Sequence, residues 1–489
     1  MKKNFILDFA AKNIKEKKLT FRIGLSLWTL LVFAYMIFVM NWGFASAGLN
    51  GKAGVSGYLG HFFPNVNEAP GTVVNQAVNW GITIGRGIGS VLVGWLIVRI
   101  SHKYTVILSL IFMLFGIVAP FSPTYAGFII LRTIFAIGGT MQIILIQPVV
   151  SNYLNQRQKA VISQFSPFFY PIGTIITLIP FAGIIGENAQ KVVRDNWQIV
   201  FLVIGLLTLI PLIGYIILGT KFDLYPANIA KKDNQEALTL MKFFKQKDTW
   251  YWTILYGSWL VAVIFPFTFS KPIFHRLIGD SSEIFNDKIS VFLIFFLTGV
   301  FVGPFTIGLF SKYQLQRRKY ISTIIGIGVF FYVLATIVFV TKVGKNPAFA
   351  KTYTDGWTWL FLFLGLFMGI CLWGIQGVIL NLPHEYPGTN PYSIGFQFGL
   401  IWGLGYTAFT IATIITSLIN MPPGIDIKKL DPNNVDGYAL GAYILIIIFS
   451  LVSSIGLALL KEPNPNYKRL LKIRSFSEIE RIKNERIKK

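Results

Sequence analysis

Two arginines stand inside long apolar runs, where a charged side chain is unusual. The first run extends from Val73 to Arg99, and Arg86 lies near its middle. A helix rises 1.5 Å per residue, which places Arg86 near the centre of a bilayer. An arginine at that depth costs about 2.5–3.5 kcal/mol on insertion scales. Arg132 stands in a later run, closer to one end. Both positions are therefore predicted functional sites.

The acidic residues indicate what these arginines bind. All 21 Asp and Glu residues fall in predicted loops, tails or helix ends, so neither arginine has a carboxylate partner inside the membrane. An unpaired buried charge is strongly disfavoured, and the planar guanidinium matches carboxylate and phosphate oxygens. The sequence therefore predicts an anionic ligand, with Arg86 as the first candidate and Arg132 as the second. The alternative is a structural arginine that bonds to helix carbonyls or reaches the interface.

Other polar and aromatic residues at helical spacing are candidates for the same site. Asn75, Asn79, Arg86 and Ser90 follow one stripe of the run 73–98. Candidates on other runs are Gln164, Tyr170, Trp259, Gln376, Gln397 and Tyr406. Each of them also has an alternative interpretation as a helix-packing residue or an interfacial aromatic.

The elements that must position these residues are membrane helices. The chain has 489 residues, of which 54% are hydrophobic and only 13% charged, far fewer charges than a soluble protein carries. The predicted fold is all-α, with twelve transmembrane helices in two pseudo-symmetric bundles of six. The predicted spans are 23–45, 73–98, 104–122, 125–150, 160–185, 197–219, 251–271, 290–310, 320–341, 357–383, 392–420 and 437–460.

The basic residues orient this layout. With both termini in the cytoplasm, the cytoplasmic segments hold 31 of the 44 Lys and Arg residues and the external loops hold 11. The predicted parts are a basic arm (1–22), a bundle (23–219), a central loop (220–250), a second bundle (251–460) and a basic tail (461–489). The net charge of +23 is thus explained by headgroup contacts rather than by nucleic acid. The tail is interpreted as a surface helix or as a docking segment.

The two halves carry matching glycine patterns. Gly85, Gly89 and Gly94 in the second span have the same spacing as Gly299, Gly303 and Gly308 in the eighth. Together with Gly81, the first set also has the small-xxx-small spacing of closely packed membrane helices. The sequence therefore predicts a six-plus-six duplication in which these spans are equivalent.

The chain resembles the major facilitator superfamily over nearly its whole length. Gly94, Arg99 and Lys103 fit the family's loop motif between the second and third helices, whereas Val98 and Ser101 replace its usual Asp and second Gly. Arg132 with Gly138, and Asn196-Trp197-Gln198, are similar to further motifs of the family. The resemblance implies two six-helix bundles around a central cavity, alternating access by rocking, and a gating role for the loop motif.

A narrower resemblance concerns Arg86. Nitrate/nitrite porters of this superfamily are similar in placing an arginine thirteen residues before the basic residue of the loop motif, as Arg86 precedes Arg99 here. Those porters pair it with an arginine in the eighth helix, where this chain has Val300. The duplication is therefore broken at that position, and the substrate group stays open.

These observations predict a secondary active transporter of a small organic or phosphorylated anion, working by exchange in the cell membrane. No intramembrane carboxylate is present to couple a proton. The alternatives are an exporter or facilitator of neutral metabolites or drugs, and a sensor or scaffold that does not transport. No motif of an enzyme, cofactor or metal site is found, the lone Cys371 excludes an intrachain disulfide, and a monomer is the default oligomeric state.

Overall fold

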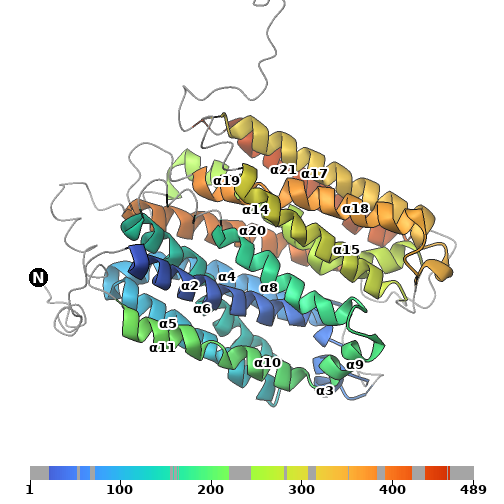
Figure 1. Cartoon of the computed structure of the whole chain (residues 1–489), viewed down its shortest axis with the longest axis horizontal. Coiled ribbons are helices and arrows are strands. Elements are labelled where there is room, and N and C mark those ends of the chain that lie inside the picture. The colour runs from blue at the N-terminus through green and yellow to red at the C-terminus, as the bar shows by residue number, and fades with distance from the viewer. Residues whose placement is uncertain are drawn as a thin grey trace, which may run out of the picture.

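The computed structural model is built of helices, most of them long and nearly parallel (Figure 1). It describes residues 21–51, 55–65, 72–154, 165–219, 244–279, 284–306, 315–350, 352–382, 391–420 and 436–459, together with Gln158, Ile162, Lys461 and Glu462. Within those residues, ten helices are long and apolar enough to cross a membrane, and Phe169–Phe181 and Gly437–Val452 are shorter apolar helices. The predicted polytopic all-α fold is confirmed.

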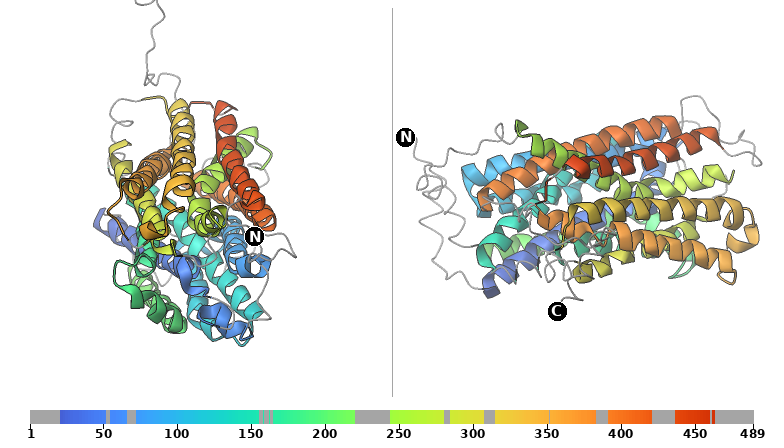
Figure 2. Two further views of the ribbon diagram at one scale, coloured as in Figure 1. Left: turned by 90° about the vertical axis from the view of Figure 1, so that its right-hand side faces the viewer. Right: turned by 90° about the horizontal axis from the view of Figure 1, so that it is seen from above.

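The helices fall into an earlier and a later set, which lie side by side (Figures 1 and 2). The earlier set is α2 (Phe21–Phe44), η1 (Ala45–Leu49), α3 (Gly57–Phe62), α4 (Thr72–Ile100), α5 (His102–Val118), η3 (Ala119–Phe121), α6 (Tyr125–Tyr153), η4 (Ser166–Phe168), α8 (Phe169–Leu178), η5 (Ile179–Phe181), α9 (Glu187–Asp195), α10 (Trp197–Leu206) and α11 (Leu209–Leu218). The later set is α14 (Lys247–Leu277), α15 (Asn286–Thr298), η7 (Gly299–Val302), α17 (Arg318–Val338), η8 (Phe339–Val343), η9 (Pro347–Ala350), α18 (Gly356–Leu372), α19 (Gln376–Asn381), α20 (Pro391–Asn420) and α21 (Gly437–Leu459).

Several predicted spans differ from the helices in the structure. The span 251–271 was predicted too short, because α14 continues to Leu277 through Pro272. The spans 197–219 and 357–383 are each interrupted, the second at Trp373 between α18 and α19. The short helices α3 and α9 were not predicted. The arm 1–20, the segment 220–243 and the tail 463–489 lie outside the described residues.

The two sets meet along pairs of helices. α4 packs along α20, and α8 packs against α15. At the first contact the backbones approach closely, since a Cβ on Gly399 would lie 2.6 Å from the Ser90 carbonyl oxygen. These seams are the surfaces that must slide or separate if the two sets rock against each other.

The glycine pattern packs the equivalent helices of each set. Gly85 and Gly89 of α4 face the backbone of α6, where a Cβ on either would lie 2.5 Å from a carbonyl oxygen. In the later set, a Cβ on Gly299 would collide with the backbone at Gly369 of α18. Gly85 and Gly299, which correspond in the two halves, therefore both bring backbones together, whereas a Cβ on Gly303, the counterpart of Gly89, would have 3.4 Å to its nearest neighbour.

Replacing Gly89 with alanine is expected to destabilise the fold by about 1–3 kcal/mol, the usual effect of overpacking. The added Cβ would lie 2.5 Å from the carbonyl oxygen of Ile137, a backbone atom that cannot turn away. Gly87 on the same helix is the matched control, since its Cβ would have 3.6 Å to its nearest neighbours. Thermal unfolding in detergent checks the prediction: equal Tm values for Gly89→Ala and Gly87→Ala would contradict it.

Candidate functional site

Arg86 lies at the contact between the two sets of helices. Its side chain is fully buried, and its Nη2 donates a hydrogen bond to the Tyr35 hydroxyl of α2 at 3.2 Å. Its Cζ is 4.2 Å from the ring centroid of Tyr406 on α20, and 5.1 and 5.2 Å from those of Phe38 and Trp42 on α2. Aromatic faces attract a cation, so these rings offset part of the desolvation of the guanidinium.

The hydrogen bonds of Arg86 are incomplete. Its Nε and Nη1 have no hydrogen-bond partner among the described residues, and no carboxylate of the described chain forms an ion pair with it. An unsatisfied buried donor carries a desolvation cost of about 1–3 kcal/mol, and more when the group is charged. An anionic ligand would accept hydrogen bonds from these two unused donors of the buried guanidinium.

More aromatic rings extend this cluster across both sets. The ring centroids of Trp42 and of Tyr170 on α8 are 6.0 Å apart, and Tyr170 stacks on Trp373 with ring centroids 5.3 Å apart. Trp373 in turn lies 6.0 Å from Trp259 of α14. Of the predicted site residues, Tyr170, Trp259 and Tyr406 therefore join the cluster around Arg86. Tyr35 and Trp42 were not among the predicted site residues. Their seven-residue spacing, which places both rings on one face of α2, could have identified them.

Arg132 lies elsewhere, inside the earlier set. Its Nη1 donates to Asn41 Oδ1 at 2.7 Å and its Nη2 to the Asn41 carbonyl at 3.3 Å, while its Cζ is 4.7 Å from the Phe201 ring. Burial raises the pKa of the nearby Tyr58 phenol far above its usual range, although the Arg132 charge opposes the shift, so Tyr58 stays neutral. The contacts of Arg132 join α6 to α2 and α10.

The other predicted site residues take several positions. Asn79 accepts hydrogen bonds from Trp42 Nε1 and from the Ser46 hydroxyl, and so links α4 to the end of α2. Gln376 is buried at the start of α19, and its Oε1 has no partner among the described residues. Gln397 is half-buried on α20. The side chain of Asn75 and the whole of Gln164 lie outside the described residues.

Two basic side chains bind the same turn at one end of the bundle. Lys271 Nζ of α14 donates to the Ala47 carbonyl at 2.9 Å, and Arg194 Nε of α9 donates to the Gly48 carbonyl at 2.8 Å. Both carbonyls belong to η1, the π-helical turn that ends the first span. A cation near the C-terminus of a helix is favourable because the helix dipole is negative there. The bond of Lys271 crosses between the two sets of helices.

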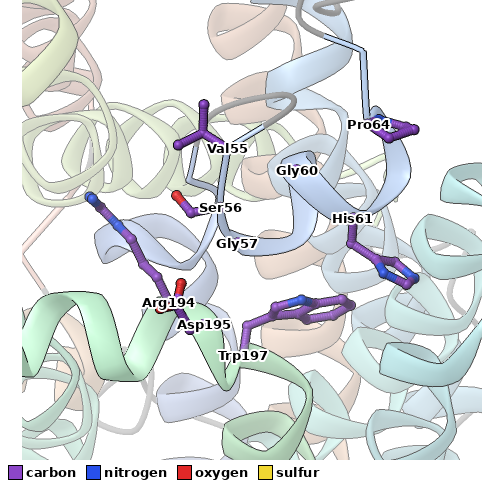
Figure 3. A pocket seen from close by; sticks show the side chains of 9 residues that line it. All are labelled: Val55, Ser56, Gly57, Gly60, His61, Pro64, Arg194, Asp195 and Trp197. Carbon is purple, nitrogen blue, oxygen red and sulfur yellow. The ribbon is translucent and has the colours of Figure 1, made fainter.

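A shallow pocket of about 330 Å³ lies beside this end (Figure 3). Residues of α3 and of the α9–α10 corner line it: Val55, Ser56, Gly57, Gly60, His61, Pro64, Arg194, Asp195 and Trp197. The His61 ring lies 5.5 Å from that of Trp197. None of the predicted ligand residues lines this pocket, so it is separate from the cluster around Arg86.

The loop motif joins α4, α5 and α11. Arg99 Cζ lies 4.7 Å from the Trp95 ring, Lys103 Nζ donates to the Ile216 carbonyl at 3.2 Å, and Gly94 lies within α4. Ser101 stands where the motif usually has its second glycine, and its φ of 76° is the only positive φ of a non-glycine residue in the described chain. That backbone conformation explains why glycine is usual there.

Replacing Ser101 with glycine is expected to stabilise the fold by about 1 kcal/mol. With ψ at 164°, Ser101 occupies a region that is essentially restricted to glycine, and its buried hydroxyl has no partner within the described residues. The control is Ser26→Gly on the exposed face of α2, where glycine weakens a regular helix. Thermal unfolding in detergent should give a higher Tm for the first variant and a lower Tm for the second. A fall in Tm for Ser101→Gly would contradict the strain argument.

The long apolar helices, the close seams between two sets and the aromatic cluster around Arg86 are those of a polytopic membrane protein. A family model described as "Mycoplasma MFS transporter" matches residues 128–421, more than half of the chain. The chain belongs to this family, and it is a transporter rather than an enzyme.

Relatives and a solved structure are similar to this chain over most of its length. An uncharacterized protein of Mesomycoplasma hyopneumoniae strain 232 is 88% identical, over 99% of this chain and 100% of its own. A major facilitator superfamily transporter of Mycoplasma genitalium is 22% identical, over 84% of this chain and 86% of its own. The crystal structure of a D-xylose–proton symporter matches with a TM-score of 0.64 at 14% identity, covering 91% of this chain and 99% of that one. That likeness shows the fold alone.

Proposed function

We propose that this transporter carries a small organic or phosphorylated anion, which Arg86 binds between the two sets of helices. The observation that carries the proposal is a fully buried guanidinium with two N–H donors unused and no described carboxylate beside it. Tyr35 and Tyr406 come from different sets and both contact Arg86. The affinity for a ligand at this position would therefore depend on how the two sets are arranged.

Exchange is the proposed mode of transport. Among the described residues, Asp436 is a carboxylate buried against a basic group. It pairs with Arg276 just before α21, away from Arg86. A proton-coupled cycle would need a carboxylate close enough to Arg86 or to the ligand for its protonation to change the binding of the ligand. Moving one negative charge into a cell against 100 mV costs about 2.3 kcal/mol, and a one-for-one anion exchange avoids this cost.

The proposed setting is the cell membrane, with both termini in the cytoplasm and bundles at 23–219 and 251–460. The positive-inside bias supports this orientation, which puts η1, Lys271 and Arg194 at the outer end. The bond between Lys271 and the Ala47 carbonyl would then close the outer entrance, and the loop motif would lie on the inner side.

A neutral substrate is the second candidate, and the aromatic cage favours it. Rings surround Arg86 closely enough to stabilise its charge without any ligand, and aromatic faces also bind uncharged organic molecules. In that case Arg86 would serve as a structural residue. A sensor or scaffold on the same fold is the third candidate, and it predicts that no solute crosses the membrane.

A stability screen of the purified full-length protein tests the proposal. Sugar phosphates, inorganic phosphate, nitrate and carboxylates are added in turn, together with neutral sugars, and the Tm is measured. A ligand at 100 times its Kd stabilises the folded state by about 2.7 kcal/mol, which gives a clear rise in Tm. We expect anions to raise the Tm. A rise with neutral solutes alone would favour the second candidate instead.

A further inference from the structure

The cluster around Arg86 holds a single charge. Among the residues that the structure describes, Arg86 is the charged side chain that the rings of Phe38, Trp42 and Tyr406 surround. Arg132 is turned toward Asn41 and Phe201, and Lys271 is bound at η1. A ligand with one negative charge would neutralise the cluster, whereas a dianion would leave one negative charge buried without compensation.

Two further buried N–H donors belong to rings that contact this cluster. The indole Nε1 atoms of Trp373 and Trp402 are buried and have no hydrogen-bond partner in the described chain. Trp402 lies 6.1 Å from Tyr406, which contacts Arg86, and Trp373 stacks on Tyr170. Nε and Nη1 of Arg86 and Nε1 of Trp402 are therefore donors that an oxyanion beside Tyr406 would satisfy, whereas the face of Trp373 stacks on Tyr170. A carboxylate or another oxyanion has the acceptor oxygens that these donors need.

The ring stack between Tyr170 and Trp373 joins the two sets of helices. Tyr170 belongs to α8 and Trp373 follows α18, and their planes lie within 24° of parallel at 5.3 Å. When the two sets separate to admit a substrate, each ring loses its partner. A flat body inserted between them would restore the stacking on both faces. A ligand without a flat body would leave both rings unstacked.

We infer that the substrate is a monoanion with a planar ring, its oxyanion bound by Arg86 and the indole N–H of Trp402 and its ring held between Tyr170 and Trp373. This inference rests on the proposed function and narrows it. It disfavours dianions such as phosphate monoesters and dicarboxylates. It also separates the role of charge, at Arg86, from the role of shape, at Trp373.

Matched pairs of probes test the inference on the purified full-length protein. Benzoate is compared with phthalate, and nicotinate with quinolinate, since each pair differs by one carboxylate on the same ring. Acetate supplies the charge without a ring, and benzyl alcohol the ring without a charge. We expect the monoanion of each pair to bind at least about tenfold more tightly than its dianion and than acetate, measured as the Kd from Tm titrations. Benzyl alcohol should bind more weakly than benzoate.

Two variants separate charge from shape. Arg86→Met should abolish the difference between benzoate and benzyl alcohol, and Trp373→Leu should weaken benzoate binding while leaving acetate binding unchanged. If dianions bind more tightly and Arg86→Met removes that binding, the inference is overturned but the proposed function stands. If no anion binds, or if anion binding persists in Arg86→Met, the proposed function falls as well.

Discussion

Replacing Arg86 with methionine is expected to abolish anion binding without destabilising the protein. The side chain is fully buried and leaves two N–H donors unsatisfied within the described residues, so without a ligand Tyr35 and the surrounding rings offset its desolvation only in part. Methionine has a similar length and no charge, and the surrounding rings pack well on its sulfur. Replacing a buried charge by an apolar side chain is often neutral or stabilising, by about 1–4 kcal/mol. We therefore expect an equal or higher Tm and no rise in Tm with anions.

Arg132→Met is the matched control for that substitution. Arg132 donates to the side chain and to the carbonyl of Asn41, and its removal would leave both oxygens buried without these donors. The Asn41 carbonyl keeps its helical donor, but the orphaned side-chain oxygen costs about 1–3 kcal/mol, so the control should lose stability. The comparison needs only thermal unfolding of the two purified variants. A similar loss of stability in Arg86→Met would show that Arg86 is structural.

Replacing Asp436 with asparagine is expected to destabilise the later set of helices by about 3–5 kcal/mol, the usual effect of breaking a buried ion pair. Asp436 precedes α21 and binds Arg276 near the end of α14, with Oδ2 2.6 Å from Nε. Its Oδ1 also accepts from the backbone N–H of Tyr438 at 2.9 Å. Asparagine can keep that helix cap through its side-chain oxygen. The loss would therefore come from the uncompensated Arg276 charge.

A double variant isolates this charge effect. Arg276→Met combined with Asp436→Asn removes the cation together with its partner and keeps the cap. Its Tm should recover much of what Asp436→Asn loses, because no unpaired charge is then buried. If the double variant unfolds at the same temperature as Asp436→Asn, the ion pair does not stabilise this part of the fold.

Much of the fold could be predicted because membrane helices follow local rules. Length and hydropathy gave the spans, and the spacing of Gly85 and Gly89 gave the face of α4 that packs on α6. The absence of intramembrane carboxylates in the sequence pointed to Arg86 as an unpaired charge, and the structure places no described carboxylate beside it. These features depend on periodicity and composition alone.

The partners of the buried side chains could not be predicted, because they depend on rotamers and on helix rotation. Arg132 and Arg86 have the same chemistry in the sequence, yet Asn41 accepts from both Nη atoms of Arg132, so that only its Nε lacks a partner in the described chain. The interruption of the tenth span at Trp373 has no strong breaker except the following Gly374. Trp373 nevertheless lies in that interruption, and its ring stacks on Tyr170. Tertiary packing between the two sets decides such contacts.

Solute counterflow in proteoliposomes tests the central claim most directly. Vesicles that hold the wild-type protein are loaded with an anion that raises its Tm, and entry of the labelled anion from outside is followed over time. Arg86→Met is reconstituted at the same density as a comparison. The account predicts transient accumulation of label with the wild-type protein and none with the variant. Equal accumulation with both proteins would contradict the role assigned to Arg86.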